Sequence, residues 1–111
     1  MEKIITYEDF TKVDLRIGTI IEVNDFPEAH RPAYQLKIDF GELGIKKSSA
    51  QITTLYTKQD LLNRQIVAVV NFPKKQIGKF MSQCLVVGAV KEKDVYLLKP
   101  ESNVKNGATV L

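Results

Sequence analysis

Hydrophobic and polar residues alternate with a period of two along two stretches of the chain. In residues 11–23 only Ile20 is out of step, and one face collects Val13, Leu15, Ile17, Ile21 and Val23. In residues 34–40 one face collects Tyr34, Leu36, Ile38 and Phe40. Such alternation is typical of strands buried on one side, because successive side chains point to opposite faces of a sheet. We therefore predict two half-buried strands, joined by a loop over residues 24–32.

Other segments predict further strands of different character. Residues 45–52 predict a third strand made mostly of polar residues, a composition typical of a sheet edge or of a strand that lines a site. Apolar runs at 66–72, interrupted by Asn71, and at 85–90 predict central strands buried on both faces. Residues 94–99 predict another strand, and 107–111 a last one.

One short helix interrupts the predicted strands. Thr57 and Asp60 have the spacing of a capping box, which predicts a helix through Leu61 and Leu62. The chain has 111 residues and no internal repeat or linker, so we expect a single domain over residues 1–111. Several short strands with one brief helix predict an all-β fold, a five-stranded barrel of the OB type.

The composition argues against most kinds of enzyme. His30 and Cys84 are the only residues of their types, so a zinc site with four Cys and His ligands is excluded. Arg31 follows His30, and its charge disfavours the imidazolium that a catalytic base must form. The six glycines match neither common nucleotide-binding motif. We expect a binding protein without metal or cofactor.

The distribution of apolar residues indicates a cytoplasmic protein. The N-terminal segment has acidic residues where a signal peptide would have its apolar run. The apolar runs at 66–70 and 85–90 are far shorter than the roughly 20 residues that a membrane span needs. We expect no membrane insertion, and the lone Cys84 can form no disulfide within the chain.

The net charge of +3 hides an asymmetry along the chain. From Leu43 to Lys91 there are eight basic residues and one acidic residue, giving +7, while the rest of the chain carries −4. Three lysines also lie between Phe72 and Phe80, a pattern that suits single-stranded nucleic acid. We favour the alternative that both rings pack in the core, but we interpret the charge asymmetry as functional.

A series of short motifs covers the chain from about Phe10 to its end. It consists of Phe10-x-Lys12-Val-Asp14-Leu15-Arg16-Ile-Gly18, Pro27-x-Ala29, Tyr34-x-Leu36-x-Ile38-Asp39-x-Gly41, Asn71, Ser82 and Val95-x-Leu97-Leu98-x-Pro100. In this order the motifs resemble the tRNA-binding domain family of OB folds. Three further stretches are similar to its CsaA-like members, which are described as export-related chaperones: Phe26-Pro-Glu-Ala-x-Arg31-x-Pro-Ala33, Ser48-Ser-Ala-Gln-Ile52 and Val69-Val-Asn-Phe-Pro73.

The resemblance implies a free-standing homodimer without catalytic activity, in which segments at the N- and C-termini form the dimer. For CsaA-like members it implies binding of unfolded preproteins, with the Sec export ATPase as a further partner. For the wider family it implies binding of tRNA by shape. The chain departs from the tRNA-binding pattern at Ser48-Ser49, Ala50-Gln51, Gly78-Lys79 and Cys84-Leu85, and these departures favour the CsaA-like interpretation.

We predict one binding site, on a basic face built from the loop 27–33, the polar third strand and the loop 74–82. The family's loop lysine corresponds to Arg31, the basic residue that opens its third strand to Lys46, and its Ser and Met pair to Ser82 and Leu85. The predicted peptide- or tRNA-binding residues are Arg31, Lys46, Ser48, Ser49, Gln51, Lys75, Lys79, Ser82 and Leu85.

Hydroxyl and amide groups in this set can bond to a peptide main chain or to a phosphate. Met81 could add adaptable apolar contacts beside Leu85. Two alternatives stay open: Ser48 and Ser49 could serve strand pairing alone, and Leu85 could belong to the core, which we favour. We expect Cys84 to be a buried apolar residue and His30 to face solvent.

Overall fold

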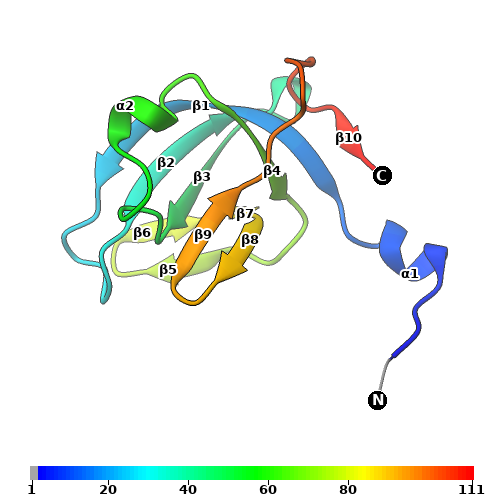
Figure 1. The fold of residues 1–111 in the computed structure, drawn as a ribbon, viewed down its shortest axis with the longest axis horizontal. Helices are drawn as coiled ribbons and strands as arrows, with labels where there is room; N and C mark the ends of the chain where they lie inside the picture. The colour runs from blue at the N-terminus through cyan, green and yellow to red at the C-terminus, as the bar shows by residue number, and fades with distance from the viewer. Residues whose placement is uncertain (1–2) are drawn as a thin grey trace.

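The two alternating segments form the centre of a six-stranded antiparallel sheet. The structure is a computed structural model that describes residues 3–111, so the first two residues of the predicted domain lie outside the described residues. β1 (Leu15–Asp25) pairs with β2 (Tyr34–Asp39) on one side and with β4 (Gln65–Val69) on the other. The order is β3-β2-β1-β4-β7, with β3 (Ile45–Ala50) and β7 (Leu85–Val86) at the ends (Figure 1). β10 (Thr109–Val110) pairs with the start of β1.

The sheet curls until its two end strands meet. Lys47 of β3 accepts a hydrogen bond from the Gln83 N–H (2.8 Å) and donates its own N–H to the Gln83 Oε1 (2.9 Å). The result is a nearly closed five-stranded barrel, and the predicted all-β OB-type fold is confirmed. Inside the barrel lie fully buried side chains, among them Ile20, Leu36, Ile38, Phe40, Leu61 and Ile66.

One residue in β1 reverses the predicted alternation. The pairing of β1 with β2 shifts between Ile20 and Glu22, which leaves Ile21 as the extra residue of a bulge. A bulge moves the side chains that follow it to the opposite face. Before the bulge the even-numbered Gly18 and Ile20 face the core, and after it Val23 packs there. Ile20 is fully buried and Ile21 is 40% exposed, so the prediction that Ile21 belonged to the buried face and that Ile20 was out of step is wrong.

The two apolar runs have different structures. Every residue of β4 is buried, as predicted for a central strand, but β4 ends at Val69, and Asn71 and Phe72 of the predicted strand are exposed. The run 85–90 is instead divided between β7 and β8 (Gly88–Lys91), and β8 forms a separate hairpin with β9 (Asp94–Leu97). Leu85 and Val90 are exposed because these short strands are covered on one face only. The prediction of a strand buried on both faces is wrong for this run.

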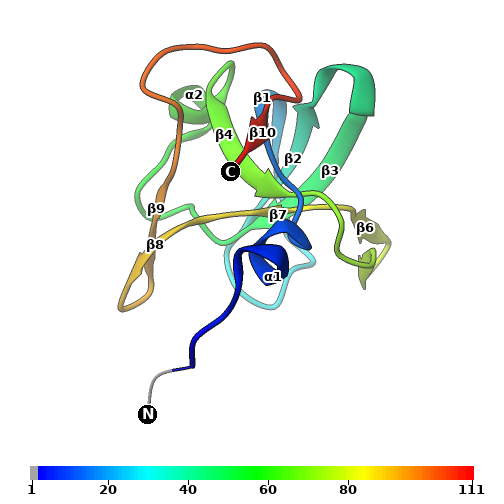
Figure 2. The ribbon, with the colours of Figure 1, turned by 90° about the vertical axis from the view of Figure 1, so that its right-hand side faces the viewer.

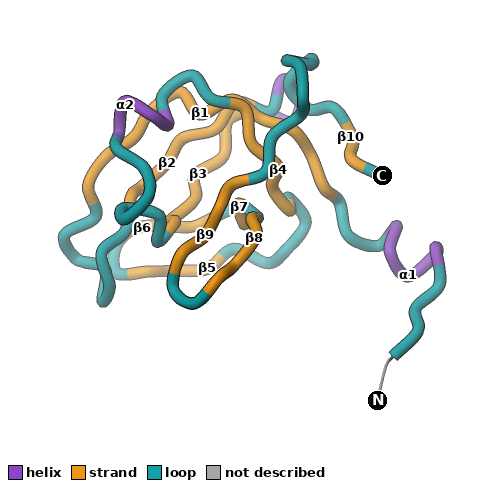
Figure 3. Tube along the Cα trace, in the orientation of Figure 1, coloured by secondary structure: helices purple, strands orange, loops and turns teal. Residues whose placement is uncertain are grey.

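Two hairpins lie at the same end of the barrel (Figure 3). One is the pair β8–β9. The other consists of β5 (Lys75–Ile77) and β6 (Phe80–Ser82), in the segment that the sequence predicted as a loop. Gly78 has a φ of +59°, a conformation that glycine adopts without strain in a tight turn.

Both α-helices begin with the same capping box. In α2 (Lys58–Leu61) the Thr57 Oγ1 accepts from the Asp60 N–H (3.1 Å) and the Asp60 Oδ2 accepts from the Thr57 N–H (2.9 Å), which confirms the predicted helix. The first helix, α1 (Tyr7–Thr11), was not predicted, although it begins with the capping box of Thr6 and Asp9. α1 buries none of its residues and projects from the barrel near the C-terminus (Figures 1 and 2). A 3₁₀ turn, η1 (Gly41–Leu43), connects β2 to β3.

Candidate functional site

Past the closure at Lys47, a cleft of about 340 Å³ lies between the end of β3 and the strands β5, β6 and β7. Its floor contains Val86 of β7 together with Val95 and Leu97 of β9. The Tyr56 hydroxyl accepts a hydrogen bond from the Leu97 N–H (3.0 Å), which fixes β9 to the barrel. Five predicted site residues line this cleft: Ser49, Gln51, Lys75, Ser82 and Leu85.

Two further hollows adjoin the cleft. One, of about 250 Å³, shares Lys75, Ser82 and Leu85 with it and adds Phe72 and Pro73. The other, of about 370 Å³, shares Gln51 and contains a sixth predicted residue, Arg31, with Pro32, Thr53, Thr54, Glu92 and Lys93. Because they share lining residues, we describe the three hollows together as the groove, which extends from Phe72 to Arg31.

Three predicted site residues do not line the groove. Ser48 is completely buried, and its hydroxyl donates a hydrogen bond to the carbonyl oxygen of Cys84 (2.9 Å). Its side chain belongs to the barrel closure, as the alternative interpretation allowed. Lys46 is half-buried near the start of β3, and Lys79 is exposed in the β5–β6 turn. These two lysines lie outside the groove and would not line the surface that a bound ligand contacts.

Two apolar side chains lie at the surface, contrary to the sequence analysis. Leu85 is 48% exposed, so the expectation that it belongs to the core is wrong. Phe72 is 52% exposed, whereas Phe80 packs on the buried Phe26 with a distance of 5.2 Å between ring centroids. The expectation that both rings of the basic segment enter the core is therefore wrong for Phe72. The exposed Phe72 and Leu85 therefore give the groove an apolar end, which the sequence pattern did not predict.

The two residues that the sequence analysis set aside have the expected environments. Cys84 is buried, and desolvation raises the pKa of its thiol to about 11, so the thiol is un-ionised at neutral pH. His30 is exposed in the loop before β2. No group of three or more His, Cys, Asp or Glu side chains within residues 3–111 is placed to hold a metal ion.

The chain matches a known protein family over most of its length. The family model described as "Putative tRNA binding domain" matches residues 15–109. The chain belongs to this family. Two crystal structures of the chaperone CsaA superpose over nearly the whole tRNA-binding domain. CsaA from Bacillus anthracis has a TM-score of 0.93 and 50% identity, covering 98% of this chain and 100% of that one.

CsaA from Picrophilus torridus has a TM-score of 0.90 and 51% identity, covering 97% of this chain and 100% of the other. The tRNA-binding domain is also 37% identical to the methionine–tRNA ligase of Thermococcus onnurineus over 106 residues. That match includes 96% of this chain but only 14% of the ligase, so the chain spans about one seventh of the length of the curated ligases it matches.

The groove of this tRNA-binding domain carries basic groups that are available to a ligand. Arg31, Lys75 and Lys93 line it, with Glu92 as the one acidic residue. Within residues 3–111, the ion pairs of the domain join other residues, such as Lys58 with Asp25 at 2.9 Å, and none involves these three basic side chains. The groove therefore combines an apolar floor, hydrogen-bonding groups and unneutralised positive charge.

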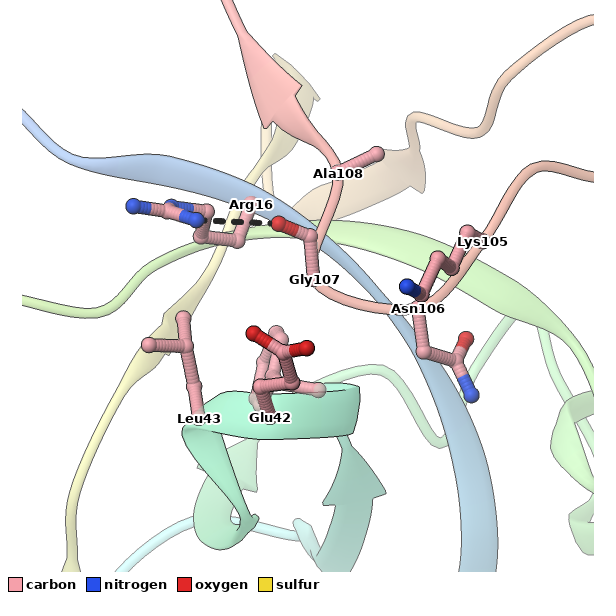
Figure 4. A pocket seen from close by; sticks show the side chains of 8 residues that line it. Arg16, Glu42, Leu43, Lys105, Asn106, Gly107 and Ala108 are labelled. Carbon is pink, nitrogen blue, oxygen red and sulfur yellow. Dashed lines mark hydrogen bonds between the residues drawn. The ribbon is translucent and has the colours of Figure 1, made fainter.

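A separate cavity of about 280 Å³ lies between η1 and the C-terminal segment of the tRNA-binding domain (Figure 4). The Arg16 guanidinium lies at its edge, donating to the Gly107 carbonyl oxygen (3.0 Å) and to the Asp14 Oδ1 (2.6 Å). Its charge is thus used within the chain. None of the predicted site residues lines this cavity, and we assign it a structural role in anchoring the C-terminal segment.

No helix in residues 3–111 has the length and apolar content required to cross a membrane.

Proposed function

We propose that the protein is a non-enzymatic, CsaA-like chaperone that binds unfolded preproteins in the groove and passes them to the Sec export machinery. The observation that carries the proposal is the groove, which offers an apolar floor and hydrogen-bonding groups along one continuous surface. Similarity at 50% identity over whole chains to proteins named as the chaperone CsaA supports it. The proposal includes one domain over residues 1–111 and the cytoplasmic location expected from the sequence.

The chemistry of the groove suits a polypeptide without fixed structure. An unfolded segment exposes apolar side chains, and burying them stabilises the complex by about 25 cal/mol per Å² of apolar surface removed from water. Val86, Val95 and Leu97 offer that surface, with the exposed Leu85 beside them. The hydroxyls of Ser49 and Ser82 bond to main-chain groups without selecting a side chain. Such a site accepts many sequences.

The proposal includes a homodimer formed by the terminal segments. α1 has five residues and buries none of them, and isolated helices this short are unstable in water. Ile4, Ile5, Tyr7 and Leu111 are exposed. A second copy of the chain would cover these apolar side chains. We expect Ile4→Glu with Ile5→Glu to give a monomer in sedimentation equilibrium, while a dimer that persists would place the interface elsewhere.

The experiment that tests the groove compares two exposed aliphatic residues, Leu85 and Val90. A fluorescein-labelled unfolded peptide that carries a signal sequence, which we refer to as the signal probe, is titrated with the protein and followed by anisotropy. Leu85→Glu places a charge in the groove, and we expect it to weaken binding about tenfold or more. Val90→Glu is the matched control, because Val90 is 70% exposed and lines none of the three hollows.

Equal weakening by the two variants would show that binding depends on general surface charge and would remove the groove from the proposal. A wild-type protein that fails to bind the signal probe would remove the chaperone function itself. Circular dichroism of both variants checks that each is folded.

tRNA is the alternative ligand, and the unneutralised basic side chains of the groove favour it together with the family membership. Contacts from lysine and arginine to phosphates release counterions, so this binding would weaken steeply as salt is raised. Titration with bulk tRNA at several salt concentrations tests it. Affinity for tRNA that exceeds affinity for the signal probe at moderate salt would make RNA the main ligand.

A further inference from the structure

The main-chain groups of β3 alternate between two directions. In an antiparallel ladder, pairs that exchange two hydrogen bonds alternate with pairs whose N–H and C=O groups face away from each other. The N–H of Phe40 donates to the carbonyl of Gly44 (3.0 Å), and the register continues without a shift through Ile38 opposite Lys46 to Tyr34 opposite Ala50. Even-numbered residues of β3 therefore bond to β2.

The N–H and C=O groups of odd-numbered residues of β3 point away from β2. Lys47 demonstrates this, because both of its main-chain groups bond to Gln83 and close the barrel. Ser49 is the next odd-numbered residue, about 7 Å further along the strand. Its N–H and C=O have the same outward direction, and within residues 3–111 neither has a hydrogen-bonding partner. Ser49 lines the cleft just where the closure ends.

Val86 of β7, in the floor of the cleft, has the same property. The Val87 N–H donates to the Val67 carbonyl (3.0 Å), so Val87 faces β4. Val86 is its neighbour and is paired with Ala68, and its main-chain groups must face away from β4. Val86 and Ser49 line the same cleft. Both residues therefore have main-chain donors and acceptors of strand type that face away from their paired strands.

We propose that the groove binds unfolded polypeptide as an added β-strand whose main chain exchanges hydrogen bonds with the N–H and C=O groups of Ser49. This inference rests on the proposed chaperone function and gives its mode of recognition. Addition of a strand to a sheet edge takes its affinity from the main chain, while alternate side chains enter pockets. Here the alternate side chains would contact Val95 and Leu97. A nucleic acid has no repeating N–H and C=O groups to form such a ladder.

The proposal explains how a chaperone could select for unfolded chains without selecting for sequence. The required feature is an extended segment whose N–H and C=O groups are free, and folded proteins use most of these groups internally. The added strand would continue the ladder that Gln83 begins at Lys47. The protein would then select ligands whose main-chain N–H and C=O groups are not already hydrogen-bonded, and apolar side chains of the ligand would add affinity.

Substitution of N-methyl for N–H along the signal probe tests the ladder. Each amide of the probe is methylated in turn, and the affinity for the wild-type protein is measured by anisotropy. We expect affinity to fall about three- to tenfold at residues two apart within one short segment and to be unchanged at the residues between them. Equal tolerance at every position, or equal loss at adjacent positions, would overturn strand addition and leave the groove as a side-chain site.

The protein side of the ladder is tested at Ser49. Proline is tolerated at edge positions whose N–H faces away from the neighbouring strand, so Ser49→Pro removes the donor but no bond to β2. We expect Ser49→Pro to bind the signal probe about tenfold more weakly and Ser49→Ala, which retains the main-chain groups, to lose less. Equal losses in the two variants would assign the effect to the hydroxyl and overturn the proposal.

The outcomes separate the inference from the function on which it rests. A signal probe that binds without the alternating response overturns strand addition alone. A probe that does not bind at all overturns both, and direct titration of fluorescein-labelled poly-uridylate with the wild-type protein and with Leu85→Glu would then show whether the groove holds RNA. A melting temperature measured by circular dichroism identifies a Ser49→Pro protein that is unfolded, and the methylated probes still decide the question in that case.

Discussion

Ser48 and Ser49 are adjacent residues with the same side chain, yet they belong to different parts of the molecule. Ser48 is completely buried and donates its hydroxyl to the Cys84 carbonyl, so it holds the barrel closed. Ser49 lines the groove. The difference follows from the period of two in a strand, which sends successive side chains to opposite faces. The polar composition of β3 therefore has two causes, closure at one residue and surface chemistry at the next.

The wall across the cleft repeats the contrast. Cys84 is buried and its carbonyl accepts the Ser48 hydrogen bond, whereas the next residue, Leu85, is half exposed beside the groove. Ser48 and Cys84 thus hold the barrel closed, while the adjacent Ser49 and Leu85 line the groove. Substitutions at the first pair should change the stability of the fold, and substitutions at the second pair should change ligand binding.

The largest expected effect comes from placing a charge at the two serines. Ser48→Asp would bury a carboxylate, and we expect the free energy of unfolding to fall by about 3 kcal/mol or more. Ser49→Asp puts the same charge at a position that reaches solvent, and we expect a change within about 0.5 kcal/mol. Urea denaturation at one fixed protein concentration measures both. Similar losses would contradict the assignment of Ser48 to the closure and Ser49 to the surface.

The next largest effect is a fall in the free energy of unfolding at high pH, caused by the buried Cys84 thiol. Burial raises the pKa of the Cys84 thiol from 9.0 to about 11. The thiol of the unfolded chain ionises first as pH rises, so the folded state has its full stability below about pH 9 and loses about 2–3 kcal/mol between pH 9 and 11. Urea denaturation across this range measures the loss. Cys84→Ala is the control, and a pH dependence that persists in this variant would belong to other groups.

Residues whose environment depends on local pattern were predicted correctly. The alternation in 34–40, the capping box at Thr57 and Asp60, the edge position of β3 and the burial of Cys84 are all confirmed. These features depend on neighbouring residues in the chain. The same rule could have found α1, because Thr6 and Asp9 repeat the spacing of Thr57 and Asp60.

The burial of other residues depends on which strand pairs beside them. Neighbouring residues in the sequence do not determine this pairing. The bulge at Ile21 is a property of the β1–β2 register, and it allows Ile20 and Val23, which are three residues apart, to face the same core. Leu85 begins one apolar run and Phe72 ends another, but β4 stops at Val69 and β7 is short, and both side chains are exposed. For the site, the charge asymmetry and the family resemblance indicated which segments come together. Only the register distinguishes Ser48 from Ser49.

A smaller effect is expected when the Ser48 hydroxyl is removed without adding charge. Ser48→Ala leaves the buried Cys84 carbonyl without that donor, and we expect a loss of about 1–2 kcal/mol in the free energy of unfolding. The Ser82 hydroxyl also approaches this carbonyl, at 3.4 Å, and can compensate in part. A double-mutant cycle with Ser82→Ala measures the compensation. Strict additivity of the two losses would show that the hydroxyls act independently.

The smallest effect distinguishes the groove from the basic face around it. Lys75 lines the groove, whereas Lys74 is exposed and lines none of its three hollows. If tRNA binds along the groove, Lys75→Ala should lower its affinity about threefold and reduce the slope of log K against log salt concentration by about one. Lys74→Ala should change both less. Equal effects of the two substitutions would mean that tRNA contacts the whole basic face, and the peptide groove would then be a separate site.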